Sequence, residues 1–224
     1  MKPVADSLGQ LLALQDIVLW EEQVAQLVKL TEELLRWNRS RNLTAISTLD
    51  EILEKHIIDS LTLLPFARLS RRMLDMGSGA GFPGLPVKVC CPSLEVVSVD
   101  AAAKKISFQK HAARMLKLEG FAAQHGRMET LGKTPAFAGR FDLVSARAVG
   151  SLSLLTRLAG PCLADEGQLI AMKGPDGVNE YQDNRAQLLA EGWTVRCEML
   201  RLPVSGARRC LLICNRGMVE NHNI

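Results

Sequence analysis

Four glycines that directly follow a short apolar run are the residues of this chain best suited to ligand chemistry. The apolar run 73–76 is typical of a buried strand, and a helical pattern begins at Leu85 or later. Glycines after a strand let the backbone turn sharply and approach a ligand that a side chain would block. Asp75 lies at the carboxyl end of the run, where open α/β sheets bind their ligands. The glycines of this predicted binding loop are Gly77, Gly79, Gly81 and Gly84.

The loop fits two ligand-binding patterns. Residues 79–84 match G-x-G-x-x-G, the dinucleotide fingerprint, which is weak evidence alone. Residues 75–81 match D-x-G-x-G-x-G, the pattern of enzymes that use S-adenosylmethionine (SAM). A strand-to-helix turn without a ligand is the third interpretation, and the density of glycines argues against it. The rest of the chain must decide between the two ligands.

Two later strand ends carry residues suited to an adenosine. Asp100 ends the expected strand 94–99, where a carboxylate accepts both ribose hydroxyls of SAM or of NAD. Capping the helix that follows is an equally good role for Asp100. The turn 126–129 after the next strand offers a backbone amide to adenine and the Met128 side chain to its face, with core packing as the alternative role of Met128.

Arg147 ends the strand expected over 141–146, at the edge where a reaction would take place. The Asn/Asp-Pro-Pro-aromatic motif of methyltransferases that act on exocyclic amines is absent there. The cysteine nucleophile of carbon-5 pyrimidine methylation is also absent, because Cys162 lies late in a helix. An arginine suits a target atom with its own lone pair, or a nearby phosphate. An ion pair with a strand-end carboxylate such as Asp75 is an equally weighted alternative.

Three further groups have a structural and a functional interpretation. His56 and Asp59 are three residues apart and share one helix face, which is more typical of a structural pair than of a catalytic one. Lys173 closes the strand expected over 167–173, where its ammonium group meets either a phosphate or solvent. No other residue is nominated as a general base.

Composition and charge limit the class of protein. The 224 residues are 47% hydrophobic and 23% charged, which suits a globular protein with a sizeable core. A net charge of +3 does not indicate a polyanion-binding surface over the whole molecule, and 4% aromatics argue against a stacking platform for single strands. The six cysteines lack C-x-x-C and zinc spacing, which favours a reducing compartment. No segment is long enough to span a membrane, so we expect a cytoplasmic protein without a metal site.

The N-terminal part is expected to be helical. Residues 7–37 show one amphipathic helical pattern, in which Trp20, Val24 and Leu27 share the apolar face. A second helix is expected from about Thr48 to Pro65. We therefore expect a helical extension over 1–70 that packs on a domain over 71–224.

The chain after the loop alternates between strands and helices, which is typical of right-handed βαβ units in a parallel sheet. Only four residues separate the last two strands, 193–202 and 207–215, so these must form an antiparallel hairpin. A parallel sheet closed by such a hairpin is the layout of SAM-dependent methyltransferases and not of dehydrogenases. The remaining strands and helices are expected over 121–125, 101–118, 152–163 and 179–191.

Five short motifs occur together in order: RNLTAI at 41–46, HIIDS at 56–60, DMGSGAGFPG at 75–84, RA at 147–148 and KG at 173–174. Over roughly 37–173 the chain resembles the ribosomal RNA small subunit methyltransferase G family, also called glucose-inhibited division protein B. The resemblance implies a Rossmann-like α/β fold and transfer of a methyl group from SAM to N7 of one guanine in bacterial 16S rRNA. Ala101 and Ala102 depart from the family pattern, so they receive no role.

The resemblance also implies roles for single residues. Guanine N7 has a lone pair and no proton to remove, so no general base is needed. Orientation of the reactants contributes up to roughly 7–11 kcal/mol in favourable cases. The orientation candidates are Asn42, His56 and Lys173. The cofactor candidates are Gly77, Ser78, Gly79, Gly81, Phe82, Asp100, Met128, Glu129 and Arg147. The RNA candidates are Arg36, Arg39, Arg41, Lys104 and Lys105, with solvated charge as the alternative for each.

Three other functions stay open at this point. A SAM-dependent methyltransferase could act on another RNA or on a small molecule, and a non-catalytic protein could bind SAM or RNA. A nicotinamide-dependent oxidoreductase is disfavoured by the terminal hairpin and by the position of Asp75. Naked rRNA and an assembled particle are both open as the substrate. We expect a monomer.

Overall fold

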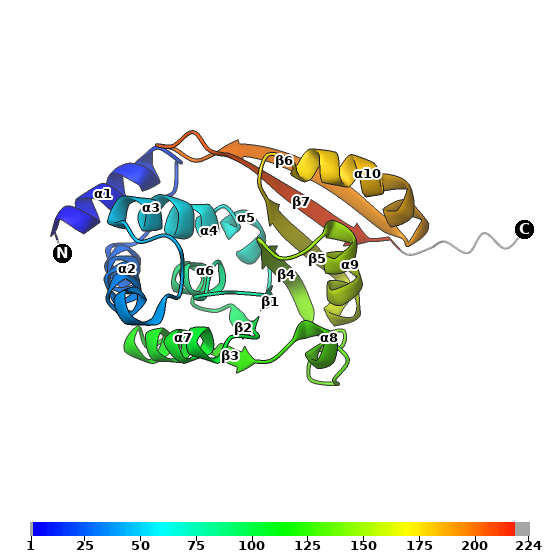
Figure 1. Ribbon diagram of the computed structural model, residues 1–224, viewed down its shortest axis with the longest axis horizontal. Coiled ribbons are helices and arrows are strands. Elements are labelled where there is room, and N and C mark those ends of the chain that lie inside the picture. The colour runs from blue at the N-terminus through cyan, green and yellow to red at the C-terminus, as the bar shows by residue number, and fades with distance from the viewer. Residues whose placement is uncertain (1, 218–224) are drawn as a thin grey trace, which may run out of the picture.

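The computed structural model describes residues 2–217, which form one seven-stranded sheet in the order β3-β2-β1-β4-β5-β7-β6 (Figure 1). Strands β1 to β5 are parallel, and β7 is antiparallel to both of its neighbours. This confirms the predicted parallel sheet with a terminal hairpin. The strands are β1 (Arg72–Met76), β2 (Glu95–Asp100), β3 (Phe121–His125), β4 (Phe141–Arg147), β5 (Leu163–Lys173), β6 (Trp193–Arg201) and β7 (Arg208–Arg216).

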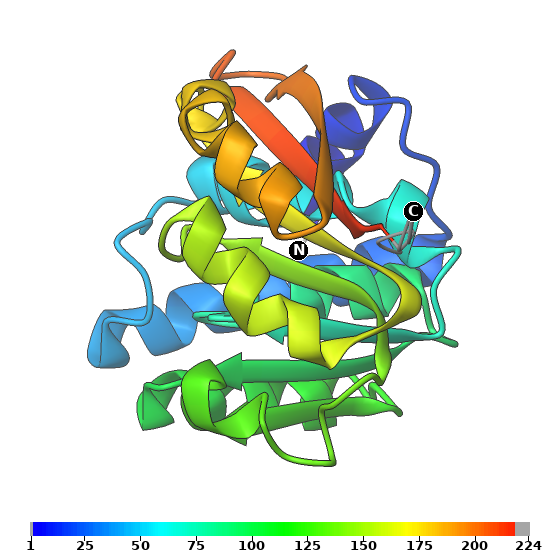
Figure 2. The same ribbon diagram turned by 90° about the vertical axis from the view of Figure 1, so that its right-hand side faces the viewer.

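Helices cover both faces of the sheet (Figure 2). Alternate strand residues point to opposite faces, so each face has its own apolar cluster. Met73 and Leu143 pack with the N-terminal helices, α6 and α7, while Leu74 and Val144 pack with α9 and α10. The helices after β1 are α6 (Gly84–Cys90), α7 (Ala103–Met115), α8 (Met128–Leu131), α9 (Leu152–Ala159) and α10 (Gly177–Ala190). All except the short α8, where a turn was expected, lie close to the predicted positions.

The prediction of one helix over 7–37 is wrong, because α1 (Lys2–Ala13) and α2 (Glu21–Arg41) are separate helices. Asp16 adopts a left-handed conformation with φ 51° in the turn that follows α1, and this conformation stops the helix from continuing. Trp20 is 79% exposed instead of lying on the apolar face, and its amide donates to the Gln23 side chain at the start of α2. The apolar spacing thus continued across a helix boundary.

The second predicted helix is present but ends earlier than expected. It runs through α3 (Leu49–Ile52), a π-helical segment η1 (Leu53–Ile58) and α4 (Asp59–Leu61). Pro65 was predicted to end this helix, but it lies in the first turn of the next one, α5 (Leu64–Ala67). Proline is well tolerated there because the first-turn amides have no partner inside the helix.

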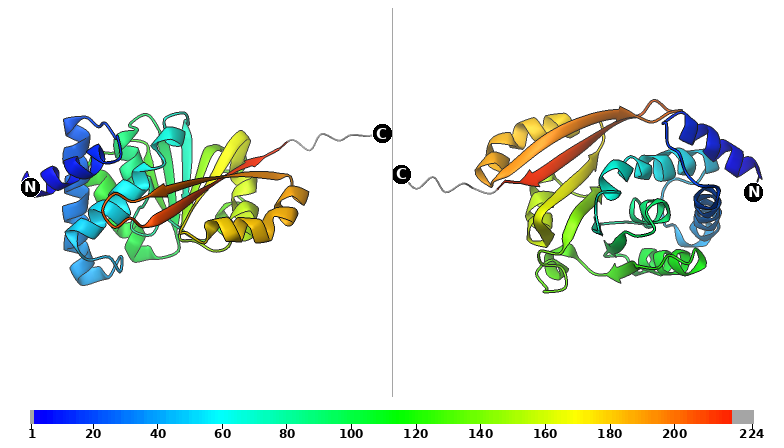
Figure 3. Two further views of the ribbon diagram at one scale, coloured as in Figure 1. Left: turned by 90° about the horizontal axis from the view of Figure 1, so that it is seen from above. Right: turned by 180° about the vertical axis from the view of Figure 1, so that it is seen from behind.

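Three contacts join the N-terminal helices to the rest of the molecule. The Gln23 amide group donates to the Cys90 carbonyl on α6 (3.1 Å), and Gln26 donates to the Leu116 carbonyl after α7 (3.1 Å). Glu54 accepts the amides of Val204 and Ser205 in the β6–β7 turn, both at 2.7 Å. Figure 3 shows this turn beside α1. Helices of the extension are therefore fixed to α6, to α7 and to the hairpin.

None of the helices in the described part of the chain is long and apolar enough to cross a membrane. The six cysteines carry free thiols, and all except the half-buried Cys197 are buried. Burial raises the pKa of Cys90 and of Cys214 to about 12. Thiols with such a pKa behave as small apolar core groups.

Candidate functional site

A cavity of about 590 Å³ lies at the carboxyl ends of β1 and β4. Residues 42–45 border it on one side, and the start of α7 borders it on another. Its volume is in the range of small-molecule and cofactor sites. The predicted site residues that line it are Asn42, His56, Gly77, Ser78, Gly79, Phe82, Lys104, Lys105 and Arg147. Residues from five separate stretches of the sequence therefore meet at this cavity.

The glycine loop forms a cradle with space for a ligand. Gly77 and Gly79 have φ angles of +65° and +59°, which side-chain-bearing residues rarely adopt. A Cβ on Gly77 would overlap the Val149 side chain. A Cβ on Gly79 would meet no residue beyond its chain neighbours closer than the Lys105 ammonium nitrogen, 3.9 Å away. The space above Gly79 is thus open to the cavity, and this fits a cofactor lying against the backbone.

Asp75 bonds to the glycine loop on the side away from the cavity and does not line the cavity. Its side chain is fully buried, accepts the Gly84 amide (2.8 Å) and accepts the Ser145 hydroxyl (3.1 Å). Burial raises the pKa of Asp75 to about 6. A Cβ on Gly84 would lie 2.8 Å from the Asp75 Oδ2 atom, so the close approach requires glycine. Asp75 therefore holds the first turn of α6 against β1.

Asp100 links the end of β2 to the glycine loop. One carboxylate oxygen accepts the Gly79 amide and the other accepts the Ala102 amide, both at 2.8 Å. Asp100 does not occupy the capping position, because α7 begins at Ala103 after Ala102. A carboxylate has about four acceptor sites, so capacity for ribose hydroxyls is left.

Arg147 is the centre of a buried polar cluster beside the cavity. It donates to the Lys55 carbonyl (2.9 Å), to His56 Nδ1 (2.9 Å) and to Asp59 Oδ2 (3.3 Å). Its ion-pair partner is therefore Asp59, whereas Asp75 was the suggested carboxylate. Burial lowers the pKa of Arg147, and the charges of Asp59 and Asp75 oppose that shift.

Phe82 and Arg209 complete the cluster. The Phe82 ring stacks on His56 with 4.6 Å between ring centroids, and the Arg147 guanidinium lies 5.7 Å from the Phe82 ring centre. Arg209 on β7 donates to Asp59 Oδ1 (3.0 Å) and does not line the cavity. His56 and Asp59 thus act together through Arg147, an arrangement created by η1 and the end of β4.

We predict that the free energy of unfolding depends on pH because of His56. Burial and the Arg147 charge lower the pKa of His56 from 6.5 to about 3. The folded state therefore binds fewer protons than the unfolded state between these values, and its stability falls as the pH falls below 6.5. The expected loss is about 1.4 kcal/mol per pH unit in that range.

The variant His56→Gln, which cannot titrate, tests this expectation. Urea unfolding at pH 7, 6, 5 and 4.5 should show a smaller loss of free energy of unfolding for the variant than for the wild type. Asp75, whose pKa shift has the opposite effect on stability, is present in both proteins and cancels in the comparison. Parallel stability curves for the two proteins would contradict the account of His56.

Several predicted site residues lie away from the cavity. Met128 is buried in the apolar cluster that includes α9, so it has the core-packing role that was its alternative. Glu129 is exposed on α8. Lys173 donates to the Gly150 carbonyl (2.8 Å) and pairs with Glu180 (2.9 Å), and it does not line the cavity. Gly81 also lies outside the cavity lining, and its missing side chain leaves room for Leu85.

The predicted RNA-contacting residues have different surroundings. The Lys104 ammonium group donates to the Arg41 and Asn42 carbonyls at the end of α2 (2.9 and 3.0 Å), while Lys105 lies over the glycine loop. Arg36 pairs with Glu33 on its own helix. Arg39 and Arg41 are exposed near the end of α2 and do not line the cavity.

The sequence interpretation missed Asn38 and Thr44. Asn38 Oδ1 accepts the amides of Leu43 (2.7 Å) and Thr44 (3.0 Å), and its amide nitrogen donates to the Thr44 carbonyl (3.0 Å). Thr44 lines the cavity and bonds to His56. The asparagine just before a segment without regular structure was the available signal, because asparagine side chains often bond to nearby backbone.

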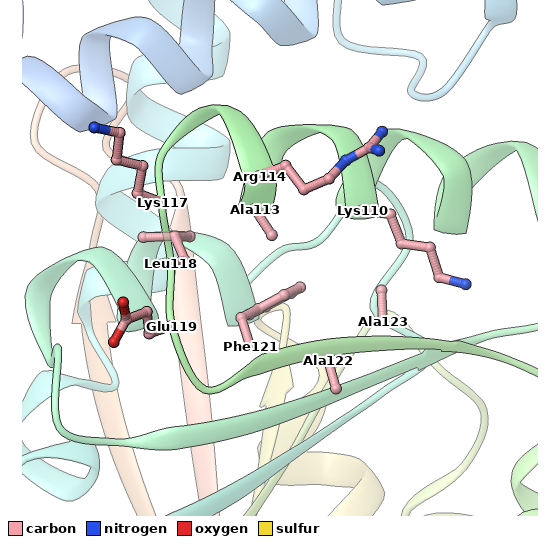
Figure 4. Close-up of a pocket in the computed structure, with 9 residues that line it drawn as sticks. All are labelled: Lys110, Ala113, Arg114, Lys117, Leu118, Glu119, Phe121, Ala122 and Ala123. Atoms are coloured by element: carbon pink, nitrogen blue, oxygen red, sulfur yellow. The ribbon is translucent and has the colours of Figure 1, made fainter.

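A second cavity, of about 750 Å³, lies between α7 and the edge strand β3 (Figure 4). Lys110, Arg114 and Lys117 border it on the side of α7, and Phe121 lies on the strand opposite. None of the predicted cofactor residues lines it.

The strand order, the glycine loop and the cavity at the strand ends define the class of SAM-dependent methyltransferases. The O-methyltransferase TomG from Streptomyces achromogenes, solved in complex with SAM, superposes with a TM-score of 0.60 at 15% identity, over 84% of this chain and 90% of that chain. M. jannaschii TYW2, solved in complex with AdoMet, has a TM-score of 0.57 at 13% identity, over 71% and 74%. These likenesses show the fold.

Sequence comparison gives the family. The model of the rRNA small subunit methyltransferase G family, GidB, matches residues 23–201. Ribosomal RNA small subunit methyltransferase G of Syntrophotalea carbinolica is 48% identical over 83% of this chain and 85% of its own. The protein of that name from Geobacter sp. strain M21 is 46% identical over 87% and 89%. The chain belongs to this family, and its cofactor is SAM.

Proposed function

We propose that this protein transfers a methyl group from SAM to N7 of one guanine in 16S rRNA of the small ribosomal subunit. The observation that carries the proposal is the cavity itself, which joins the glycine loop to the Arg147–His56 pair and to residues 42–45. One side is suited to the cofactor and the other is suited to a base. A nicotinamide oxidoreductase has no support in this fold, because the sheet ends in an antiparallel hairpin.

The glycine loop and Asp100 are the proposed cofactor cradle. Backbone at Gly77, Ser78 and Gly79 would hold the methionine and ribose portions, and Asp100 would accept ribose hydroxyls through its remaining lone pairs. Phe82 packs against His56 and Arg147. Met128 and Glu129 are proposed to contact the adenine through the backbone of their turn only, because the Met128 side chain packs in the core.

Bound SAM supplies an electrophilic methyl group, and the protein has to present the target nitrogen to it in line. N7 carries a lone pair, so no residue needs to remove a proton. The Nδ1 lone pair of His56 accepts from Arg147, which leaves this histidine unsuited to act as a base. The methylated guanine is cationic, so the buried Arg147 is proposed to serve the cofactor carboxylate or a phosphate rather than the reacting ring.

The rRNA backbone is proposed to follow α7. Lys104 and Lys105 lie at the cavity, while Lys110, Arg114 and Lys117 border the second cavity toward the end of the helix. Lys105 and Arg114 are nine residues apart, which is about 14 Å along a helix. Arg36, Arg39 and Arg41 at the end of α2 extend the basic surface. Binding through these groups should weaken steeply with added salt.

Within this proposal, residues 1–70 are a helical extension that supplies Asn42, Thr44 and His56, and 71–224 are the methyltransferase domain. A single chain lines the whole cavity, so the proposed site needs no second copy, and a monomer is proposed. A cytoplasmic protein is proposed, because bacterial rRNA is in the cytoplasm.

Methyl transfer from radiolabelled SAM tests the proposal. The acceptors are 16S rRNA and small subunits that lack the modification, and the labelled nucleoside is identified after digestion. Label in 7-methylguanosine is the expected result, and SAM but not NAD should raise the melting temperature. Label in another nucleoside, or no label despite SAM binding, would contradict the proposal. Comparing the two acceptors also shows whether the enzyme needs an assembled particle.

A further inference from the structure

The hydrogen bonds around Thr44 fix the direction in which its hydroxyl can donate. Asn38 clamps the backbone on both sides of Thr44 through the three bonds described above, so the position of this residue is defined. The side chain is half-buried and lines the 590 Å³ cavity. Its hydroxyl oxygen lies 3.0 Å from His56 Nε2 and 3.2 Å from the Ile46 amide nitrogen.

Arg147 determines the tautomer of His56. A guanidinium group has donors only, so His56 Nδ1, 2.9 Å from Arg147, must accept. The ring is neutral because burial and the Arg147 charge lower the pKa of His56 to about 3. The single ring proton is therefore on Nε2, and Nε2 donates to the Thr44 hydroxyl oxygen.

The Thr44 oxygen consequently accepts two hydrogen bonds, from His56 Nε2 and from the Ile46 amide. A hydroxyl oxygen has two acceptor lone pairs, and both are used. Its own proton has no acceptor among residues 2–217 other than the nitrogen that already donates to it. The Thr44 hydroxyl is thus an obligate donor at the wall of the cavity.

We propose that the Thr44 hydroxyl donates to O6 of the target guanine and thereby selects guanine over adenine. On a guanine, N7 and O6 are neighbouring acceptors, whereas adenine presents a donating amino group in place of O6. A hydroxyl that can only donate forms a hydrogen bond with O6 of guanine. With adenine, the hydroxyl and the amino group are two donors that face each other. Arg147 and His56 hold this donor in place. The inference rests on the proposed function, because it requires guanine N7 as the acceptor.

A cycle of variants and substrates tests this inference. The variants are Thr44→Val, which removes the hydroxyl, and Thr44→Ser, which keeps it. The substrates are 16S rRNA carrying guanine at the mapped target position and the same RNA carrying 2-aminopurine there, a purine with N7 and without O6. The readouts are kcat/KM for methyl transfer and the Kd for SAM.

We expect 2-aminopurine to lower kcat/KM of the wild type and of Thr44→Ser by about 10- to 100-fold. Thr44→Val should lose a similar factor with guanine and lose little more with 2-aminopurine. The Kd for SAM should be the same in all three proteins. If Thr44→Val unfolds, as its melting curve would show, Thr44→Ala takes its place, since alanine also lacks the hydroxyl.

Two outcomes would overturn the inference. In the first, 2-aminopurine costs Thr44→Val as much as it costs the wild type, so the hydroxyl and O6 are not coupled. In the second, Thr44→Val weakens SAM binding, so the hydroxyl serves the cofactor carboxylate. Failure of the proposed function gives a different result, because the wild type would then label no guanine at all.

Discussion

Replacing Arg147 by methionine is expected to lower kcat/KM for rRNA methylation by about 100-fold or more, the effect of misplacing a reacting group by about 1 Å. Methionine fills much of the volume but donates no hydrogen bond. The Lys55 carbonyl and His56 Nδ1 lose their donor, and Asp59 loses one of its two arginines. His56 and Thr44 are then free to change orientation at the cavity wall. Removing one partner of a buried ion pair also costs about 3 kcal/mol of stability.

Arg209→Met is the matched control. Arg209 also pairs with Asp59, at 3.0 Å, but it does not line the cavity. This variant should lose stability to a comparable extent while its kcat/KM stays within about threefold of the wild type. Chemical denaturation and steady-state kinetics on both variants separate the two effects. Equal loss of activity in both would mean that Arg147 acts only through stability.

The affinities of Arg147→Met for SAM and for RNA distinguish between two roles of Arg147. If it serves the cofactor carboxylate, Arg147→Met weakens SAM binding, and if it serves a phosphate of the substrate, the variant weakens RNA binding. A variant that keeps both affinities would refute both roles and would leave the orientation of His56 as the remaining function.

Gly79→Ala is expected to weaken SAM binding by about 10- to 100-fold. The new methyl group would enter the space above the loop, where the cofactor is proposed to lie, and overpacking of this kind costs about 1–3 kcal/mol. The loop itself should survive, because a Cβ at this position meets no protein atom closer than 3.9 Å apart from its chain neighbours. Isothermal titration of SAM measures the effect.

Gly139→Ala is the control for backbone strain. Gly139 has a φ of +63°, almost the same as the +59° of Gly79, and a Cβ there would meet nothing within 4 Å. Both variants should therefore lose about the same stability, roughly 1–2 kcal/mol for the left-handed conformation. Only Gly79→Ala should affect SAM. Unchanged SAM affinity in Gly79→Ala would place the cofactor elsewhere.

The sheet and the loop were predictable because their signals are local. Glycine spacing after an apolar run and a four-residue gap between two strands each need only a short window of sequence. The break between α1 and α2 was missed because Trp20 continued the apolar spacing while being exposed in the fold. Periodicity records where apolar residues occur and not which of them are buried.

The polar cluster was only partly predictable because its partners are far apart in sequence. Asp59 and Arg147 are 88 positions apart, and η1 with the end of β4 brings them together. Arg209, which shares Asp59, comes from the last strand. The partners of Lys173 could not be predicted for the same reason, because the packing of α9 and α10 brings Gly150 and Glu180 to it. Such pairings depend on tertiary structure.

The most direct test of the account is a crystal structure of the protein with S-adenosylhomocysteine, the product form of the cofactor. We predict that the ligand occupies the 590 Å³ cavity, against the backbone of Gly77 and Gly79 and with its ribose near Asp100. Its sulfur should then face Thr44 and His56 across the space left for guanine. A ligand bound in the larger cavity between α7 and β3, or away from the glycine loop, would contradict the account.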